Sequence, residues 1–330
     1  MVQAPHETEL VTDDFPGALA RLQEEGMRLD AIWPADDPHT ALLSADGRRV
    51  RLTSRPDEPP PPAGLPAFRP GFVLTRAGSE AGEGRAGMAY RDLIPGRLGG
   101  HMIASHIHVP DGPVADWVHY HRIALQLIAV RRGRARVVYE GQGDPFEMLA
   151  GDLVLQPPGI RHRVLEASEG LEVVELTCPA AHETFADHEM ALPGAADPAR
   201  TWGGQPFLHH CGAAAPWRPW HGGEAQDTGL GAATAGLAEA RFVRPGASDA
   251  LALPPHDGEL VFGFVLAGHA RLDYGEGHDL GPADAFVIPP GEPWRLIRLS
   301  RIFRLLHVTT CAPDEKRRVV GSTAADPLQT

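Results

Sequence analysis

The chain has 330 residues, of which 43% are hydrophobic and 22% charged, and these values are typical of globular proteins rather than disordered or fibrous chains. A net charge of -13 argues against nucleic-acid binding, because an acidic surface repels phosphate backbones. Three cysteines argue against a disulfide framework, and without a leader-like start or a stretch of 18 apolar residues we expect a cytoplasmic protein with no membrane contact.

The pattern of apolar and turn-forming residues in 1–56 predicts a small α+β module with the order strand, helix and three strands. The helix is expected within residues 13–29, with Asp13 or Asp14 as its N-cap and Leu19 and Leu22 on its apolar face. This order resembles one half of a vicinal-oxygen-chelate, or glyoxalase-like, module. No convincing pair of metal ligands stands at its strand ends, and a structural or dimerising segment is the alternative interpretation.

A proline-rich linker at 57–69 is followed by two strand-rich halves, which we place at 70–195 and 196–330. Both halves close on a similar strand, around Cys178 in the first and Cys311 in the second. A Pro-x-Gly turn stands upstream of each of these strands. The two halves therefore indicate an internal duplication of a β unit of roughly 115 residues.

Histidines and a glutamine are spaced in the first half as metal ligands would be. His119 and His121 are two residues apart, so both imidazoles project from the same face of a strand. Gln126 follows five residues later, and His162 follows the turn made by Pro157–Gly159. Three imidazoles and an amide oxygen suit a divalent first-row metal with open coordination positions.

These residues resemble the two motifs of the cupin superfamily. The first motif is matched by His119-x-His121-x4-Gln126-x6-Gly133, and the second by Gly151-x5-Pro157-x-Gly159-x2-His162-x3-Glu166. Gln126 replaces the usual glutamate, Glu166 replaces an asparagine, and Pro113 stands where the first motif has a glycine. The resemblance implies a mainly β protein with two cupin, jelly-roll-like antiparallel β-barrels after the N-terminal module, and one divalent metal ion per chain in the first barrel.

The second half keeps the framework of the motifs without their ligands. The metal positions fall on Pro254, His256 and Val261, and the third histidine position falls on Trp294. A single histidine does not hold a catalytic metal. We therefore expect the Trp294 indole to fill the interior of a degenerate second barrel that serves as scaffold, lid or dimer surface.

His106 and His108 form another alternating pair, on an expected strand just before the motif. One of them would line the cavity as the acid or base of the reaction, or both are polar residues at the surface or rim. The spacing alone leaves these alternatives open.

A neutral ligand set leaves the charge of the metal free for an anionic substrate, which favours Fe(II) and a mononuclear dioxygenase acting on a small chelating acid, enol or phenol together with O2. The alternative is a redox-neutral isomerase, lyase or decarboxylase that uses Mn(II), Zn(II) or Ni(II). A third hypothesis is a non-catalytic protein that binds a small molecule. Beyond a small-molecule substrate, the resemblance suggests a homodimer.

Overall fold

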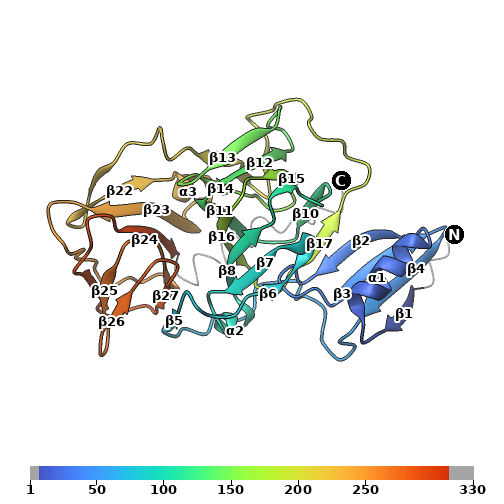
Figure 1. Ribbon diagram of the computed structural model, residues 1–330, viewed down its shortest axis with the longest axis horizontal. Coiled ribbons are helices and arrows are strands. Elements are labelled where there is room, and N and C mark those ends of the chain that lie inside the picture. The colour runs from blue at the N-terminus through green and yellow to red at the C-terminus, as the bar shows by residue number, and fades with distance from the viewer. Residues whose placement is uncertain (1–6, 312–330) are drawn as a thin grey trace.

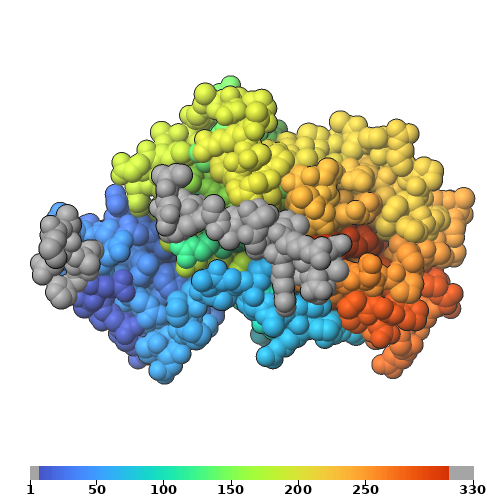
Figure 2. Space-filling model, turned by 180° about the vertical axis from the view of Figure 1, so that it is seen from behind, coloured from blue at the N-terminus to red at the C-terminus, as the bar shows by residue number. Residues whose placement is uncertain are grey.

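The computed structural model describes residues 7–311. Three bodies follow one another along its longest axis: the N-terminal module, a first β-barrel and a second β-barrel (Figure 1). The view from behind again shows the N-terminal module at one end and the second barrel at the other (Figure 2). The structure is thus mainly β, with one small α+β portion, as the sequence predicts.

The N-terminal module has the predicted order of one strand, one helix and three strands. Its helix begins after Asp14, whose carboxylate accepts a hydrogen bond from the backbone N–H of Gly17 at 3.0 Å, so that Asp14 rather than Asp13 is the N-cap. Phe15 and Ala18 bury the inner face of the helix against the sheet, with Leu19 and Leu22 partly buried beside them. The elements are β1 (Glu7–Val11), α1 (Phe15–Glu24), β2 (Arg28–Trp33), β3 (Thr40–Ala45) and β4 (Arg48–Thr53).

The sheet of the N-terminal module continues without a break into the first barrel. Strand β2 pairs with β17 (Thr184–Ala186), which pairs in turn with β10 (His119–His121) (Figure 1). The whole sheet has ten strands and begins β1-β4-β3-β2-β17-β10. Its remaining strands are β15 (His162–Ala167), β12 (Arg134–Tyr139), β13 (Phe146–Leu149) and, paired with β15, β9 (Gly112–Pro113).

A second sheet of seven strands closes the first barrel. Three short helical segments lie between strands, namely the 3-10 turn η1 (Arg85–Gly87), α2 (Arg97–Gly100) and, later in the chain, α3 (Leu230–Ala233). The strands of the second sheet are, in spatial order, β20 (Leu208–His210), β14 (Leu153–Leu155), β11 (Leu125–Arg132), β16 (Leu171–Cys178), β8 (Ile103–Val109), β7 (Ala89–Asp92) and β6 (Gly82–Glu83).

The second barrel repeats this design with a seven-stranded and a three-stranded sheet. A two-stranded ribbon of β18 (Thr201–Trp202) and β19 (Gln205–Pro206) precedes it. Its larger sheet has the order β21 (Arg218–Trp220), β22 (Gly223–Asp227), β23 (Ala238–Pro245), β29 (Arg304–Thr310), β24 (Val261–Ala267), β27 (Ala285–Ile288) and β5 (Val73–Thr75). Its smaller sheet is β26 (His278–Leu280), β25 (Ala270–Asp273) and β28 (Arg295–Ile297).

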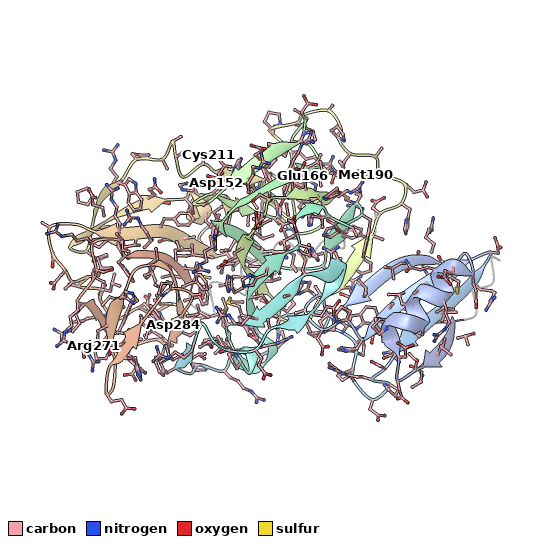
Figure 3. The ribbon with its side chains drawn as sticks, in the orientation of Figure 1. Asp152, Glu166, Met190, Cys211, Arg271 and Asp284 are labelled. Atoms are coloured by element: carbon pink, nitrogen blue, oxygen red, sulfur yellow. The ribbon has the colours of Figure 1, made fainter. Side chains whose placement is uncertain are left out.

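Each barrel takes one strand from the other side of the predicted domain boundary. Strand β5 lies just after the linker yet pairs with β27 of the second barrel, and β20 pairs with β14 of the first. Asp284 fixes β5 in place, because its carboxylate accepts hydrogen bonds from the Arg76 guanidinium and the Ala77 N–H (Figure 3). The boundaries at 70 and 196 remain predictions, but the exchange ties the two barrels together.

The largest apolar core lies between the two barrels. Leu127 and Leu176 reach it from the outer face of the first barrel, and Phe262 and Phe264 reach it from the second. Strands β11 and β24 are therefore apolar on both faces, which is typical of strands that are covered on both sides. Among residues 7–311, no helix is long and apolar enough to cross a membrane.

Candidate metal centre

The three predicted histidines meet inside the first barrel. His119 and His121 project from the same face of β10, and His162 pairs with His119 across the β10–β15 ladder. The ring centroids are 4.1 Å apart for His119 and His162, 5.1 Å for His119 and His121, and 5.3 Å for His121 and His162. One ring nitrogen from each lies within 4.8 Å of the others, and all three side chains are buried.

Each imidazole is oriented by a contact to its Nδ1 atom, so Nε2 is the nitrogen that would bind a metal. Such contacts fix the tautomer and the ring orientation of a ligating histidine. The partners of Nδ1 are the Trp117 carbonyl for His119 at 2.8 Å, the Ile160 carbonyl for His162 at 3.1 Å, and the Thr184 hydroxyl for His121 at 3.2 Å. In His119 a metal would displace the Arg85 guanidinium, whose Nη2 atom lies 3.1 Å from Nε2.

Burial keeps these histidines neutral. It lowers the pKa of His119 and of His121 well below the ordinary value, and the charge of Arg85 adds to the effect at both sites. Burial also lowers the pKa of His162, to about 4. Neutral imidazoles at neutral pH are the form that binds a divalent metal.

Gln126 lies on the inner face of β11 and fits the role of a fourth ligand. It is almost fully buried, and its Oε1 atom has no hydrogen-bond partner in the structure. A buried carbonyl oxygen without a partner is costly, at about 1–3 kcal/mol, unless a further group satisfies it. Its amide is hydrogen-bonded to the carboxylate of Glu175, which faces the same interior from β16. The three imidazoles and this orphaned oxygen together fit a divalent metal ion.

Arg85 is a site residue that the sequence pattern did not reveal. It is buried in the turn η1, and its Nη2 atom lies 3.1 Å from Nε2 of His119. Burial alone would lower its pKa, but the charge of Asp116 raises the pKa above the ordinary value. Asp116 is itself buried and lies 2.5 Å from the Arg85 guanidinium. Ala86 adopts a left-handed φ of 57°, a conformation that costs about 1–3 kcal/mol and that is found most often at functional sites.

A small cavity of about 80 Å³ opens beside the histidines. Its wall is mostly apolar, with Arg85 and Glu175 as its charged members. Burial raises the pKa of Glu175 above its ordinary value, although hydrogen bonds with Gln126 and Thr177 act in the opposite direction. Further lining residues with polar atoms are Tyr90, Tyr139 and Gln156, and both amide atoms of Gln156 lack a partner.

The cavity does not include the second predicted histidine pair. Strand β8 turns Ile107 and Val109 towards the cavity, which places His106 and His108 on the opposite face. His106 contacts the Glu172 carboxylate at 2.9 Å and the ring of Phe264 in the second barrel. His106 is therefore buried at the junction of the barrels and His108 is exposed, and of the two alternatives the structure favours polar residues outside the cavity.

A second group of possible ligands arises at this junction, because His106, His108 and Glu172 come within 4.8 Å of one another. Two arginines already occupy it. The Arg131 guanidinium donates a hydrogen bond to Glu172, and Arg91 lies 3.2 Å from His106. His106 and Arg131 both contact Oε2 of Glu172, and we regard the group as a polar contact between the barrels.

In the second barrel, Trp294 occupies the motif position that His162 occupies in the first. The side chain is only 3% exposed and packs in the interior cluster with Val261 and Phe286, as expected. The His256 imidazole instead contacts the Ile288 carbonyl at 3.0 Å. Among the described residues of the second barrel, no three candidate ligands lie close enough to share a metal ion.

Two further motif positions behave as surface or framework residues. Glu166 is exposed on β15, at the position where the cupin motif has an asparagine (Figure 3). Gly159 adopts a φ of 79° in the turn before His162, a conformation that favours glycine. This turn sets the third histidine at the start of β15, opposite His119.

Comparison with known proteins agrees with this geometry. Residues 105–178, which include all four predicted ligands, match the family described as "Cupin domain". This segment is a cupin domain. No curated protein sequence matches it. None of the comparisons supports the resemblance of the N-terminal module to a glyoxalase-like half module.

Solved structures share the two-barrel fold at low sequence identity. A salicylate 1,2-dioxygenase from Pseudoaminobacter salicylatoxidans has a TM-score of 0.54 and 16% identity, over 74% of this chain and 82% of its own. Oxalate decarboxylase from Bacillus subtilis has a TM-score of 0.52 and 12% identity, over 78% of this chain and 80% of its own. Protein Ylba from E. coli has a TM-score of 0.53 and 12% identity, over 76% and 95%.

Proposed function

We propose that the first barrel binds one divalent metal ion through His119, His121, His162 and Gln126, and that the cupin is a mononuclear Fe(II) dioxygenase. The observation that carries the proposal is the uncharged ligand set, three neutral imidazoles and an orphaned amide oxygen. No protein carboxylate among these four ligands offsets the charge of the metal. Bound iron would supply Lewis acidity and electron transfer to O2.

The cavity suits a small anionic substrate. Its apolar wall excludes water, and the Arg85 guanidinium provides a fixed positive charge next to His119. A carboxylate or phenolate that entered would satisfy Arg85 by a charge-assisted hydrogen bond. Its other end would lie near Glu175, whose pKa is raised by burial, a shift that favours an acid–base role for a carboxyl group. We therefore assign the acid–base role to Glu175 instead of His106 or His108.

The redox-neutral alternative is favoured by the same carboxyl group. A decarboxylase or isomerase needs a proton donor inside a site that excludes water, and Glu175 would meet that need. One of the structurally similar Bacillus subtilis oxalate decarboxylases was described for its Mn(II) centres. In that case the metal is Mn(II) and the reaction consumes no O2.

The decisive experiment combines metal analysis with an O2 electrode. Protein purified without added metal should contain about one metal ion per chain. Iron-loaded protein should consume O2 in the presence of catechols, hydroxybenzoates or hydroxy acids, and zinc-loaded protein should not. Equal turnover of such an acid by Mn(II)-loaded protein without O2 would replace the dioxygenase by the redox-neutral enzyme.

A matched pair of variants separates the site from the rest of the fold. His162→Ala should lose both the metal and the activity. His269→Ala changes an exposed histidine of the second barrel and should retain both. A second metal ion per chain that survives His162→Ala would contradict the single-site proposal.

A further inference from the structure

The N-terminal module is connected to the metal site by a single intervening strand. Ile32 and Ala31 of β2 pair with Thr184 and Phe185 of β17. The next strand is β10, which carries His119 and His121. Thr184 therefore touches the module on one side and the His121 imidazole on the other, at 3.2 Å from Nδ1. A displacement of β2 would therefore move β17, and with it the Thr184 hydroxyl that contacts the predicted ligand His121.

The segment that follows β2 reaches the cavity itself. Ala35 belongs to the cavity wall together with His119 and His121. Its carbonyl accepts a hydrogen bond from the backbone N–H of Arg85 at 2.9 Å. The carboxylate of the following residue, Asp36, lies 2.5 Å from the Arg97 guanidinium and anchors the segment to the first barrel.

The close approach of this segment requires glycine at position 84. A Cβ atom on Gly84 would lie 2.4 Å from the Tyr90 ring and 2.7 Å from the Ala35 carbonyl oxygen. Real Cβ atoms do not approach that closely, so a larger residue would push the segment away from the barrel. The absence of a side chain at Gly84 thus allows Ala35 to reach its place in the cavity wall.

The N-terminal module also helps to position Arg85 and His119, through Trp117. Trp117 packs against the apolar core of the module, and the Arg85 guanidinium lies over its indole at 5.0 Å from the ring centroid. The carbonyl of Trp117 accepts the Nδ1–H of His119 at 2.8 Å. The position of Arg85 and the orientation of His119 thus both depend on packing against the module.

We propose that the N-terminal module is a specificity element of the metal site, in which the segment around Ala35 sets the largest ligand that the cavity admits. This inference rests on the proposed metal site. It gives the module a role in ligand selection in place of a purely structural or dimerising one. The class of ligand is a small organic anion that binds between the metal and Arg85.

The test uses the full chain loaded with Co(II), whose visible absorption changes when an anion joins its coordination. Formate, acetate, propionate and benzoate are titrated in order of size, and the size at which binding falls off is recorded. Ala35→Phe should retain Co(II) and shift this limit to a smaller anion, with the affinity of the largest anion that wild type binds reduced at least about tenfold. Ala35→Gly should shift the limit to a larger anion.

The matched control is Ala20→Phe, which adds the same ring to an exposed position of α1. It should leave the size limit unchanged. The inference is overturned if wild type, Ala35→Phe and Ala35→Gly share one limit, or if cobalt-loaded wild type binds none of the anions. Because Ala35→Gly removes bulk, its result stands even if Ala35→Phe does not fold. Failure of wild type to bind Co(II) would instead contradict the metal site itself.

Discussion

The buried ion pair of Arg85 and Asp116 offers a quantitative test of how the site is held. Asp116 lies 2.5 Å from the Arg85 guanidinium and also accepts hydrogen bonds from the backbone N–H groups of Trp117 and Val164, each at 2.9 Å. Asp116→Asn preserves the shape but removes the charge, which leaves Arg85 buried without a counter-ion. The amide can also satisfy only one of the two backbone donors through its oxygen.

Breaking a buried pair in this way costs about 3–5 kcal/mol, since the remaining charge cannot reach water. Replacing both partners by uncharged groups costs less, so the double variant Asp116→Asn with Arg85→Met should be more stable than Asp116→Asn alone. The free energy of unfolding of the metal-free protein in urea measures both effects. Asp273→Asn is the matched control, because its exposed partner Arg295 makes a surface pair worth about 1 kcal/mol or less.

Additive losses in the double variant would refute this account of the site. They would mean that the two charges do not stabilise each other, and that Arg85 is held by packing on Trp117 instead. A decrease of less than about 1 kcal/mol in the free energy of unfolding of Asp116→Asn would refute it as well, because a buried guanidinium without a counter-ion destabilises a protein by more than that.

Three further predictions concern the two barrel interiors. Gln126→Ala should weaken metal binding at least about tenfold by calorimetric titration, and Gln126→Glu should restore or exceed the wild-type affinity, because a carboxylate is the stronger ligand. Trp294→Ala should cost about 3–5 kcal/mol in urea unfolding and leave the metal content unchanged. Burial lowers the pKa of His307 to about 3, so the unfolded state binds more protons between pH 6.5 and 3 and stability falls as the pH falls through that window. His307→Gln should flatten this decline, which is on the order of 4 kcal/mol, and an unchanged slope would contradict it.

The cluster of candidate metal ligands could be predicted from sequence because local geometry determines its arrangement. His119 and His121 are two residues apart on a strand and therefore share a face. The turn at Gly159 brings His162 back opposite His119. These relations hold for any barrel with this register. The spacing therefore predicted the three imidazoles, and the core position of Gln126, without knowledge of the tertiary structure.

The sequence left the placement of His106 and His108 open for a reason of parity. Alternation along β8 shows that the two share a face, but not which face is inside. In many sheets the polar face is solvated and the choice is clear, but here both faces are covered, one by the cavity and the other by the second barrel. Ile107 and His106 are both almost fully buried, so composition did not distinguish the two sides.

Arg85 and the role of Ala35 could not be predicted because no spacing rule relates them to the motif. Both come from irregular backbone. Ala35 approaches the histidines because β2 pairs with β17, about 150 residues later in the chain, and Arg85 is held there by its ion pair with Asp116. Glu175 was within reach of the sequence. It shares a face of β16 with Val173 and Thr177. A carboxylate within such a mostly apolar strand is unusual.

The two barrels differ most clearly at two equivalent positions on their inner faces. In the first barrel Gln126 pairs with Thr177, and Glu175 follows one step along the same inner face. In the second, Val261 pairs with Thr309, and His307 takes the place of Glu175. The first interior keeps a carboxyl, a guanidinium paired with Asp116, and an amide whose oxygen has no partner in the structure. The second interior fills the same space with the Trp294 indole and a neutral imidazole, although the indole N–H and the His307 Nδ1 atom also lack a partner there. Both interiors thus bury polar atoms without a partner, but among the described residues only the first places three imidazoles around the space beside them.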